Sequence, residues 1–197
     1  MSFIKKVSPT LIATLTLIFA LAGASFAKAK NTQFPDVKIK NFGQMDDRFY
    51  RGARPKEQDY KALAALGIKT IIDLTDNSRD FEQPAVEGAG LRYINIPMED
   101  KSYPSMEQVN QFLKVVNDPA TGKFFVHCAG GRHRTGVVGA VYRFNHDGWN
   151  LEQVLAEMNR YEFGSGFGHG KQKDFVQDYW QQFQAKNTNA VGVHAGR

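Results

Sequence analysis

Short apolar runs rich in β-branched residues alternate along this chain with segments of helical spacing, and this alternation most restricts the possible folds. Ile68–Leu74, Leu91–Pro97 and Lys123–His127 each predict a strand. Between the second and third runs, apolar residues recur three and four positions apart from Met106 to Val116, which predicts a helix. Strands that alternate with helices favour an α/β domain, in which helices flank a central, mostly parallel sheet.

One further strand and four further helices are expected outside this central part. They are a strand at Arg48–Arg51 and helices from Pro55 to Leu66, from Thr135 to His146, after an N-cap at Asn150, and from about Lys171 to Gln184. The polar stretch Thr75–Gly90 leaves room for a short helical turn. The glycine-rich segment Gly164–Gly170 is interpreted as a connector between the last two helices, and the alternative is a loop that covers the functional pocket with His169.

Residues 1–27 have the three parts of a secretory signal peptide. Two lysines supply the basic start, Leu11–Ala22 is the apolar centre, and small residues precede an expected cleavage after Ala27. Cleavage after Ala29 is the alternative. The apolar centre is shorter than the roughly 20 residues of a membrane-spanning helix, so we expect cleavage and no stable membrane span. The mature protein is therefore expected to be secreted or periplasmic.

No internal repeat or linker divides the rest of the chain, so we expect one domain at residues 45–185. An extended lead-in at 28–44 and a loose tail at 186–197 would flank it. The net charge of +5 comes without a dense block of lysine and arginine, which argues against nucleic-acid binding. A single cysteine excludes an internal disulfide and a Cys-rich zinc site, and the five histidines do not have metal-ligand spacing. The oligomeric state is left open.

Cys128, the only cysteine, directly follows the strand Lys123–His127. Two glycines lie in the turn after it, and a helix begins near Arg134. Glycines allow backbone N–H groups to converge on one point, and a helix N-terminus adds partial positive charge. Such surroundings lower a thiol pKa from ~8.5 into a range of ~3.5–7.5. The sequence therefore predicts a nucleophilic thiolate at the floor of an anion-binding cup.

The run His127-Cys128-(five residues)-Arg134-Thr135-Gly136 resembles the signature of the cysteine-dependent protein tyrosine and dual-specificity phosphatases. Three upstream segments resemble the atypical bacterial, plant and fungal dual-specificity phosphatases, so the likeness extends over roughly residues 45–160. These segments are Phe49–Pro55, Gly67–Leu74 and Tyr93–Met98. The resemblance implies a Cys-x5-Arg loop between a strand and a helix, a phosphorylated substrate, and a mechanism without metal or cofactor.

The resemblance also implies a role for each matching residue. Cys128 is expected to form a phosphocysteine, and Arg134 to bind two phosphate oxygens through its planar guanidinium. The Thr135 hydroxyl is expected to donate to the sulfur, and His127 to hold the loop and support a low thiol pKa. The backbone amides of the cup are expected to bind the substrate. They belong to Ala129, Gly130, Gly131, Arg132, His133 and Arg134.

A phosphoester leaving group also needs a proton from a general acid. The family takes this proton from an aspartate in a loop before the cysteine, and Asp100, which follows the strand Leu91–Pro97, fits that position. Glu99 and Asp73 are the rivals. Arg51 and Arg54 are expected either to flank the site or to lie on a solvated strand edge.

Three alternative functions remain beside a protein phosphatase. The first is an inositol (pyro)phosphate phosphatase that uses the same chemistry. Some eukaryotic relatives act on inositol pyrophosphates and often carry lysine where this chain has Arg132. Arginine keeps the positive charge, so a polyanionic substrate fits. A rhodanese-like sulfurtransferase also holds a cysteine in an anion-binding loop, but its loop is shorter and lacks the Arg-Thr-Gly ending. A non-catalytic phosphate-binding module would lack Cys128 or Arg134, and both are present.

Overall fold

The computed structural model describes residues 34–78, 80–164 and 166–194, with side chains to residue 188. These residues belong to one compact unit. The expected signal peptide at residues 1–27 lies outside the described residues. Within the described ranges, no helix has both the length and the apolarity that crossing a membrane requires.

A five-stranded sheet with the order β1-β2-β5-β3-β4 forms the centre of the unit. All neighbouring strands run parallel except β1, which is antiparallel to β2, so the predicted mostly parallel sheet is confirmed. The strands are β1 (Gly43–Gln44), β2 (Phe49–Ala53), β3 (Ile68–Thr75), β4 (Arg92–Met98) and β5 (Lys123–Cys128). Because β2, β3, β4 and β5 are parallel, their carboxyl ends meet at one edge, where ligands bind in such sheets.

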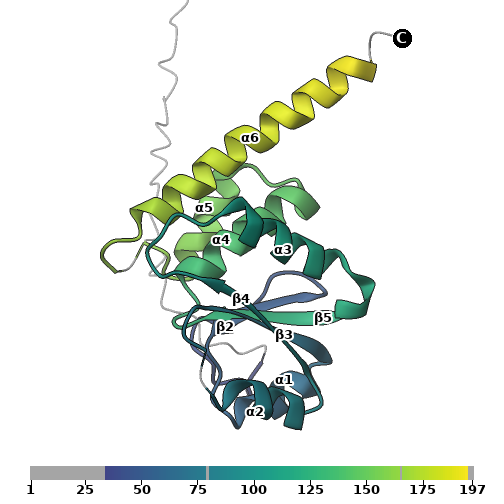
Figure 1. Cartoon of the computed structure of the whole chain (residues 1–197), viewed down its shortest axis with the longest axis vertical. Helices are drawn as coiled ribbons and strands as arrows, with labels where there is room; N and C mark the ends of the chain where they lie inside the picture. Colours follow the sequence, from purple (N-terminus) through teal and green to yellow (C-terminus); the bar gives the residue numbers. More distant parts are fainter. Residues whose placement is uncertain (1–33, 79, 165, 195–197) are drawn as a thin grey trace, which may run out of the picture. The chain divides into compact units, whose positions relative to one another are not determined.

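Helices cover both faces of this sheet (Figure 1). One face carries α1 (Asp59–Ala65) and α2 (Glu82–Gly88). The opposite face carries α3, α4, α5 and α6, and the last of these extends beyond its neighbours. Their bounds are Met106–Asn117 for α3, His133–Tyr142 for α4, Leu151–Arg160 for α5 and Gly170–His194 for α6. A 3-10 turn at Pro119–Thr121 precedes β5, and a π-helical turn at Arg143–Asp147 follows α4.

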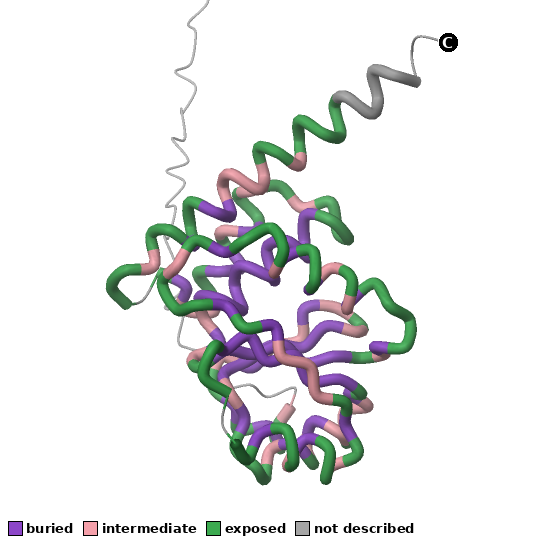
Figure 2. Tube along the Cα trace, in the orientation of Figure 1, coloured by how far each residue is buried: buried purple, intermediate pink, exposed green. Residues whose placement is uncertain are grey.

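Side chains of β5 alternate between two cores, one on each face of the sheet. Phe124, Val126 and Cys128 belong to the core beneath α3 and α4. Phe125 belongs to the core beneath α1 and α2, and alternation along a strand sends His127 to the same face. Every residue of α4 is buried, so this helix is enclosed between the sheet and its neighbours, and Figure 2 shows that buried central layer. The strand therefore delivers Cys128 and His127 to opposite faces.

The predicted lead-in and tail are both wrong in their bounds. Val37, Ile39 and Phe42 of the predicted lead-in are buried in the α1 and α2 core, so the folded unit begins before residue 45. The predicted tail is helical up to His194 because α6 continues through it. Adding a residue to an existing helix costs far less than nucleating one, and no proline interrupts this stretch.

Two helix boundaries also differ from the prediction. The helix expected from Pro55 begins only at Asp59, whose carboxylate accepts a hydrogen bond from the Lys56 amide in a preceding turn. The helix expected at Thr135–His146 is divided into α4 and the π-helical turn, which ends at Gly148 with a φ of 63°. The strands at residues 68–74, 91–97 and 123–127, the helix at 106–116 and the Asn150 cap are confirmed within one or two residues.

Candidate active site

Cys128 is the last residue of β5, and its side chain is 3% exposed. Burial alone raises the pKa of the Cys128 thiol. Hydrogen bonds to the sulfur from the amides of Thr135 and Arg132, a contact with the Thr135 hydroxyl and the charge of Arg134 outweigh burial, so the thiol pKa lies below its ordinary value. The predicted features of a reactive thiol thus lie together around this sulfur.

The Thr135 hydroxyl is buried beside that sulfur. Within the described part of the chain it has no hydrogen-bond partner of regular geometry. The hydroxyl nevertheless acts on the sulfur and lowers the pKa of the Cys128 thiol. We take this interaction as a weak hydrogen bond because sulfur is a diffuse acceptor.

The loop after Cys128 is held from outside by two side chains. Arg51 Nη2 donates to the Gly131 carbonyl over 2.6 Å, and Asn41 Nδ2 donates to the Gly130 carbonyl over 2.8 Å. Gly131 has a φ of 64°, and a Cβ atom there would lie 2.3 Å from the carbonyl carbon of Gly52. Only glycine fits this position, both for its backbone conformation and for its closeness to β2.

Of the two positions expected for Arg51, the one that flanks the site is confirmed, because Arg51 holds the loop and interacts with the charge of Cys128, and a solvated edge is wrong because Arg51 is fully buried. Its guanidinium lies 4.0 Å from the centroid of the Tyr161 ring. Burial lowers the pKa of Arg51 to about 10, so the guanidinium stays charged at neutral pH. Asn41 received no role from the sequence, because it lies in the predicted lead-in.

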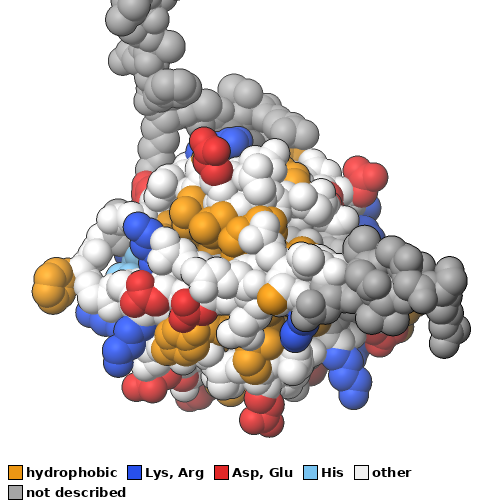
Figure 3. All heavy atoms as spheres, turned by 90° about the horizontal axis from the view of Figure 1, so that it is seen from above, with side chains coloured by type: hydrophobic (Ala, Val, Ile, Leu, Met, Phe, Trp, Pro, Cys, Tyr) orange, Lys and Arg blue, Asp and Glu red, His pale blue; other side chains and the backbone are white. Residues whose placement is uncertain are grey.

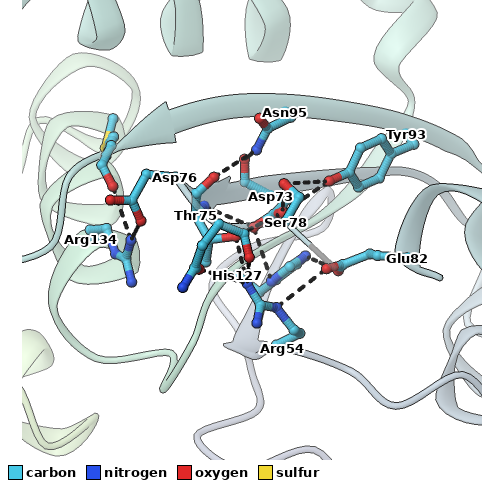
Figure 4. A network of polar contacts seen from close by, with 12 residues as sticks. Arg54, Asp73, Thr75, Asp76, Ser78, Glu82, Tyr93, Asn95, His127 and Arg134 are labelled. Carbon is cyan, nitrogen blue, oxygen red and sulfur yellow. Dashed lines mark hydrogen bonds and ion pairs between the residues drawn. The ribbon is translucent and has the colours of Figure 1, made fainter. Parts of the chain in front are cut away.

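Arg134 lies in the first turn of α4 and is 5% exposed. Its Nη1 donates to Asp76 Oδ1 and to the Met98 carbonyl, each over 2.9 Å, and its Nη2 lies 3.8 Å from Asp100 Oδ1. Figure 4 shows the pairing of Arg134 with Asp76. Asp76 was missed, although an acidic residue directly after β3 must lie at the edge where β5 delivers the cysteine.

A pocket of about 90 Å³ opens on the sulfur. This volume lies well below the range of small-molecule sites, so the pocket suits a compact tetrahedral group. The lining residues are Asp100, Cys128, Ala129, Gly130, Arg132, His133, Arg134 and His169.

Among the three candidate acids, only Asp100 lines this pocket. Its side chain is half exposed. Glu99 is exposed and is not a lining residue. Asp73 is fully buried on β3, and its carboxylate accepts hydrogen bonds from Thr75, Ser78 and Tyr93.

His127 contacts α2 and β3 on the other face of the sheet. Its Nε2 lies 2.9 Å from Glu82 Oε1, and its Nδ1 lies 3.7 Å from Asp73 Oδ1 (Figure 4). Any support that His127 gives to the loop therefore passes through the backbone of β5. Arg54, which was expected to flank the site or to lie on a solvated strand edge, belongs to the same network. Its Nε lies 3.3 Å from Glu82 Oε2, and its Nη2 donates to Thr75 Oγ1 over 2.6 Å.

Asp73, Glu82 and His127 bring ligand atoms within 4.8 Å of one another, so we tested this cluster as a metal site. The Asp73 oxygens already accept hydrogen bonds, and Glu82 accepts one from the Tyr60 hydroxyl while pairing with Arg54. Burial acts to raise the pKa of Asp73, but the charge of His127 and the hydrogen bonds from Thr75 outweigh it and lower the pKa. This chemistry fits a buried ion-pair network better than an ion-binding site.

The segment Gly164–Gly170, interpreted above as a connector, reaches the pocket. His169 lines it, and the His169 ring stacks on that of His133 with centroids 3.3 Å apart and an interplanar angle of 11°. The alternative interpretation, in which this loop and His169 cover the pocket, therefore fits the structure better than a connector alone, although the stacking on His133, 36 positions away in another element, was not predicted.

A family model described as "DSP-PTPase phosphatase fused to NAD+ Kinase" matches residues 24–178. The chain is 34% identical over 128 residues to the probable tyrosine-protein phosphatase DG1060 of Dictyostelium discoideum, covering 61% of this chain and 75% of that one. It is 27% identical over 124 residues to the dual specificity protein phosphatase TpbA of Pseudomonas aeruginosa, covering 63% of this chain and 56% of that one.

Two solved structures show the same fold. The core catalytic domain of the PP-IP phosphatase SIW14 from S. cerevisiae matches with a TM-score of 0.62 at 23% identity, covering 76% of this chain and 94% of that one. P. aeruginosa TpbA in complex with pTyr matches with a TM-score of 0.60 at 22% identity, covering 79% and 90%.

Proposed function

The chain belongs to the family of DSP-type protein tyrosine phosphatases, which are cysteine-dependent enzymes, and from this premise we propose that it hydrolyses phosphoric monoesters through a phosphocysteine at Cys128. One observation carries the proposal: the Cys128 thiol, whose pKa is lowered, lines a pocket of about 90 Å³ together with Arg134 and Asp100. A thiolate is the nucleophilic form of cysteine, and cationic groups around it favour the approach of a phosphate dianion.

In the first step the Cys128 sulfur attacks phosphorus, and the bond between phosphorus and the leaving oxygen breaks. Asp100 gives its proton to that oxygen, so the alcohol leaves neutral. A guanidinium carries five N–H donors. Asp76 and the Met98 carbonyl hold Nη1 of Arg134. The N–H groups on Nη2 and Nε are left to bind phosphate oxygens as negative charge builds in the transition state.

In the second step a water molecule attacks the phosphocysteine, and the sulfur–phosphorus bond breaks to release inorganic phosphate. Asp100, now ionised, takes a proton from the water. The Thr135 hydroxyl, buried beside the sulfur, stabilises the departing thiolate.

The experiment that tests this reaction is phosphate release by the purified protein and by Cys128→Ser and Asp100→Asn. We expect loss of turnover in Cys128→Ser by at least about 1,000-fold. Asp100→Asn should slow hydrolysis by about 100-fold, because positioned proton transfer contributes that much. Vanadate should inhibit the wild type, and a chelator should leave its rate unchanged. Full turnover by Cys128→Ser would falsify the mechanism, and thiosulfate-to-cyanide transfer by the wild type would favour the sulfurtransferase.

The substrate class divides into two candidates. A phosphoprotein is supported by the names of DG1060 and TpbA, and an inositol pyrophosphate by the name of SIW14 and by the charge of Arg132 at the pocket. A phosphate-release screen over phosphotyrosine and phosphoserine peptides and inositol phosphates decides between them. The preferred class is the one with the highest kcat/KM.

We also propose that the protein acts outside the cytoplasm, on the basis of the basic start, apolar centre and small residues in positions 1–27. Expression in a bacterium followed by fractionation should place the protein in the periplasm or medium. N-terminal sequencing should then begin at Lys28, or at Lys30 for the alternative cleavage. A cytoplasmic protein that keeps residues 1–27 would contradict this proposal.

A further inference from the structure

The segment that carries Asp100 runs from Met98, the last residue of β4, to Pro104, shortly before α3. We call residues 98–104 the acid segment. Met98 and Pro104 are buried, whereas Glu99 is exposed and the Asp100 side chain is half exposed. Figure 3 shows the helical face of the molecule, where acidic, basic and histidine side chains lie at one edge. Packing in the core fixes the two ends of the acid segment, so other contacts must fix its middle.

The backbone directly after Asp100 adopts an unfavourable conformation. Lys101 has a φ of 62°, in the left-handed region that residues with a side chain seldom occupy. Such a conformation persists only where the surrounding structure holds it. A free acid segment would relax toward an ordinary backbone conformation and move Asp100 relative to the pocket. The observed conformation therefore depends on contacts that hold the segment.

One side chain, that of Gln108 in the first turn of α3, connects the two ends of the acid segment. Its Nε2 donates to the Pro97 carbonyl over 2.7 Å, and its Oε1 accepts from the Ser105 amide over 2.9 Å. Pro97 directly precedes the segment and Ser105 directly follows it, so this bridge closes a loop that contains Asp100. A carbonyl only accepts and a backbone N–H only donates, so the bridge needs a side chain that does both, as the amide of glutamine does.

A second capping box in the chain lacks this bridge. The backbone amide of Gln108 donates to Ser105 Oγ, and with the bond to Oε1 this completes a capping box on α3. Gln153 and Asn150 form the same reciprocal pair on α5. Within the described residues, however, Nε2 of Gln153 donates to no backbone carbonyl. The hydrogen bond from Gln108 to Pro97 is therefore additional to what helix capping requires.

Contacts with α6 and α4 hold the acid segment on either side of Asp100. The Tyr103 hydroxyl donates to Asp178 Oδ2 over 2.8 Å, and the Tyr103 ring packs edge-on against Phe175 with ring centroids 5.2 Å apart. On the other side, Arg134 donates to the Met98 carbonyl. The Gln108 bridge joins the ends of the segment outside both contacts, so it limits how far they can separate.

We propose that Gln108 is a positioning residue for the general acid, and that its bridge from Pro97 to Ser105 holds Asp100 at the catalytic pocket before substrate binds. The inference rests on the proposed function, because it assigns a residue to the proton-transfer step. A proton donor that is already in place transfers its proton without a prior rearrangement of the loop. Loss of the bridge therefore slows the reactions that need this proton and spares those that do not.

The test compares Gln108→Glu with Gln153→Glu in the full-length protein. Glutamate keeps the capping box in each helix, but an ionised carboxylate cannot donate to the Pro97 carbonyl. Phenyl phosphate has a poor leaving group that needs the proton, whereas dinitrophenyl phosphate has a good leaving group that departs without it. We expect Gln108→Glu to lower kcat/KM about tenfold for phenyl phosphate and less than about twofold for dinitrophenyl phosphate. Gln153→Glu should change both values by less than about twofold.

Two further variants separate positioning from charge and from folding. Gln108→Met removes the bridge without adding a negative charge near Asp100, and it should give the same selective loss of about tenfold. In the Asp100→Asn background, Gln108→Glu should change kcat/KM for phenyl phosphate by less than about twofold, because the proton that Gln108 positions is already absent.

Three results would overturn the proposal. They are an equal loss on both esters in Gln108→Glu, no loss on phenyl phosphate, and a loss of the same size in the Asp100→Asn background. Failure of the proposed function gives a different pattern. The wild type then releases no phosphate from either ester, or Asp100→Asn hydrolyses phenyl phosphate as fast as the wild type.

Discussion

Cys128 and His127 are neighbours on β5, yet the two faces of the sheet place them in contrasting surroundings. Both side chains are buried among charged groups. The sulfur opens on a pocket with Arg134 and Asp100, whereas His127 is enclosed between Asp73 and Glu82. Similar charged groups therefore serve a reaction on the open face and hold the strand ends together on the closed face. Access to a pocket and the pairing of the charged groups, rather than residue type, therefore distinguish the reactive face from the structural one.

The closed face should respond to mutation through stability. Glu82→Ala leaves Arg54 and His127 buried without their carboxylate, and breaking a buried pair in this way costs about 3–5 kcal/mol. Urea denaturation of Glu82→Ala and of Glu87→Ala, an exposed acid on the same helix, measures the effect. Equal stability of the two variants would mean that the network contributes nothing to the fold.

The open face should respond through catalysis. Arg134→Lys keeps the charge but loses the planar fork, and we expect kcat/KM to fall about 100- to 1,000-fold, as for other losses of a transition-state donor. Arg54→Lys is the matched change on the closed face, and its kcat/KM should stay within about fivefold of the wild type. Steady-state kinetics on one phosphotyrosine peptide compares them. Similar losses in both variants would remove the distinction between the faces.

The smallest expected effect is the contribution of Asp73 ionisation to the pH dependence of the unfolding free energy. The pKa of Asp73 in the folded protein is lowered, so its stabilising contribution is complete above the unfolded-state pKa of about 3.9 and is lost as pH falls through the folded-state pKa. The difference in unfolding free energy between wild type and Asp73→Asn should therefore narrow from about pH 6 to about pH 3. Urea titrations across this range measure it. A difference that stays constant would show that Asp73 is not ionised in the network.

The sequence predicts local features of this molecule well. The β-branched run at residues 68–74 forms β3, and helical spacing at 106–116 forms α3, because burial of one face is encoded in neighbouring residues. The placement of Cys128 between a strand and a helix follows from the same local pattern. Local periodicity was sufficient for the positions of these strands and helices, and the resemblance of the run from His127 to Gly136 supplied the loop.

Contacts between segments far apart in the sequence could not be predicted from local periodicity. Asn41 and Arg51 hold carbonyls of the loop 89 and 80 positions away, and the pairing of Asp76 with Arg134 depends on which strands are neighbours. Strand order and register decide these contacts, and no short run of residues encodes them. For the same reason local pattern favours a connector for the glycine-rich segment around His169 and leaves a loop over the pocket as the alternative, and the fold brings this segment to the pocket.

Ionisation of the Cys128 sulfur in its cup can be measured by the rate of its alkylation with iodoacetamide across a pH series. Since the chain has one cysteine, every label falls on this residue, and Cys128→Ser supplies the blank. We expect the alkylation rate to rise with a midpoint well below the pH of ~8.5 at which an ordinary thiol ionises, and activity to be lost in step with labelling. A midpoint at or above that value would contradict this ionisation.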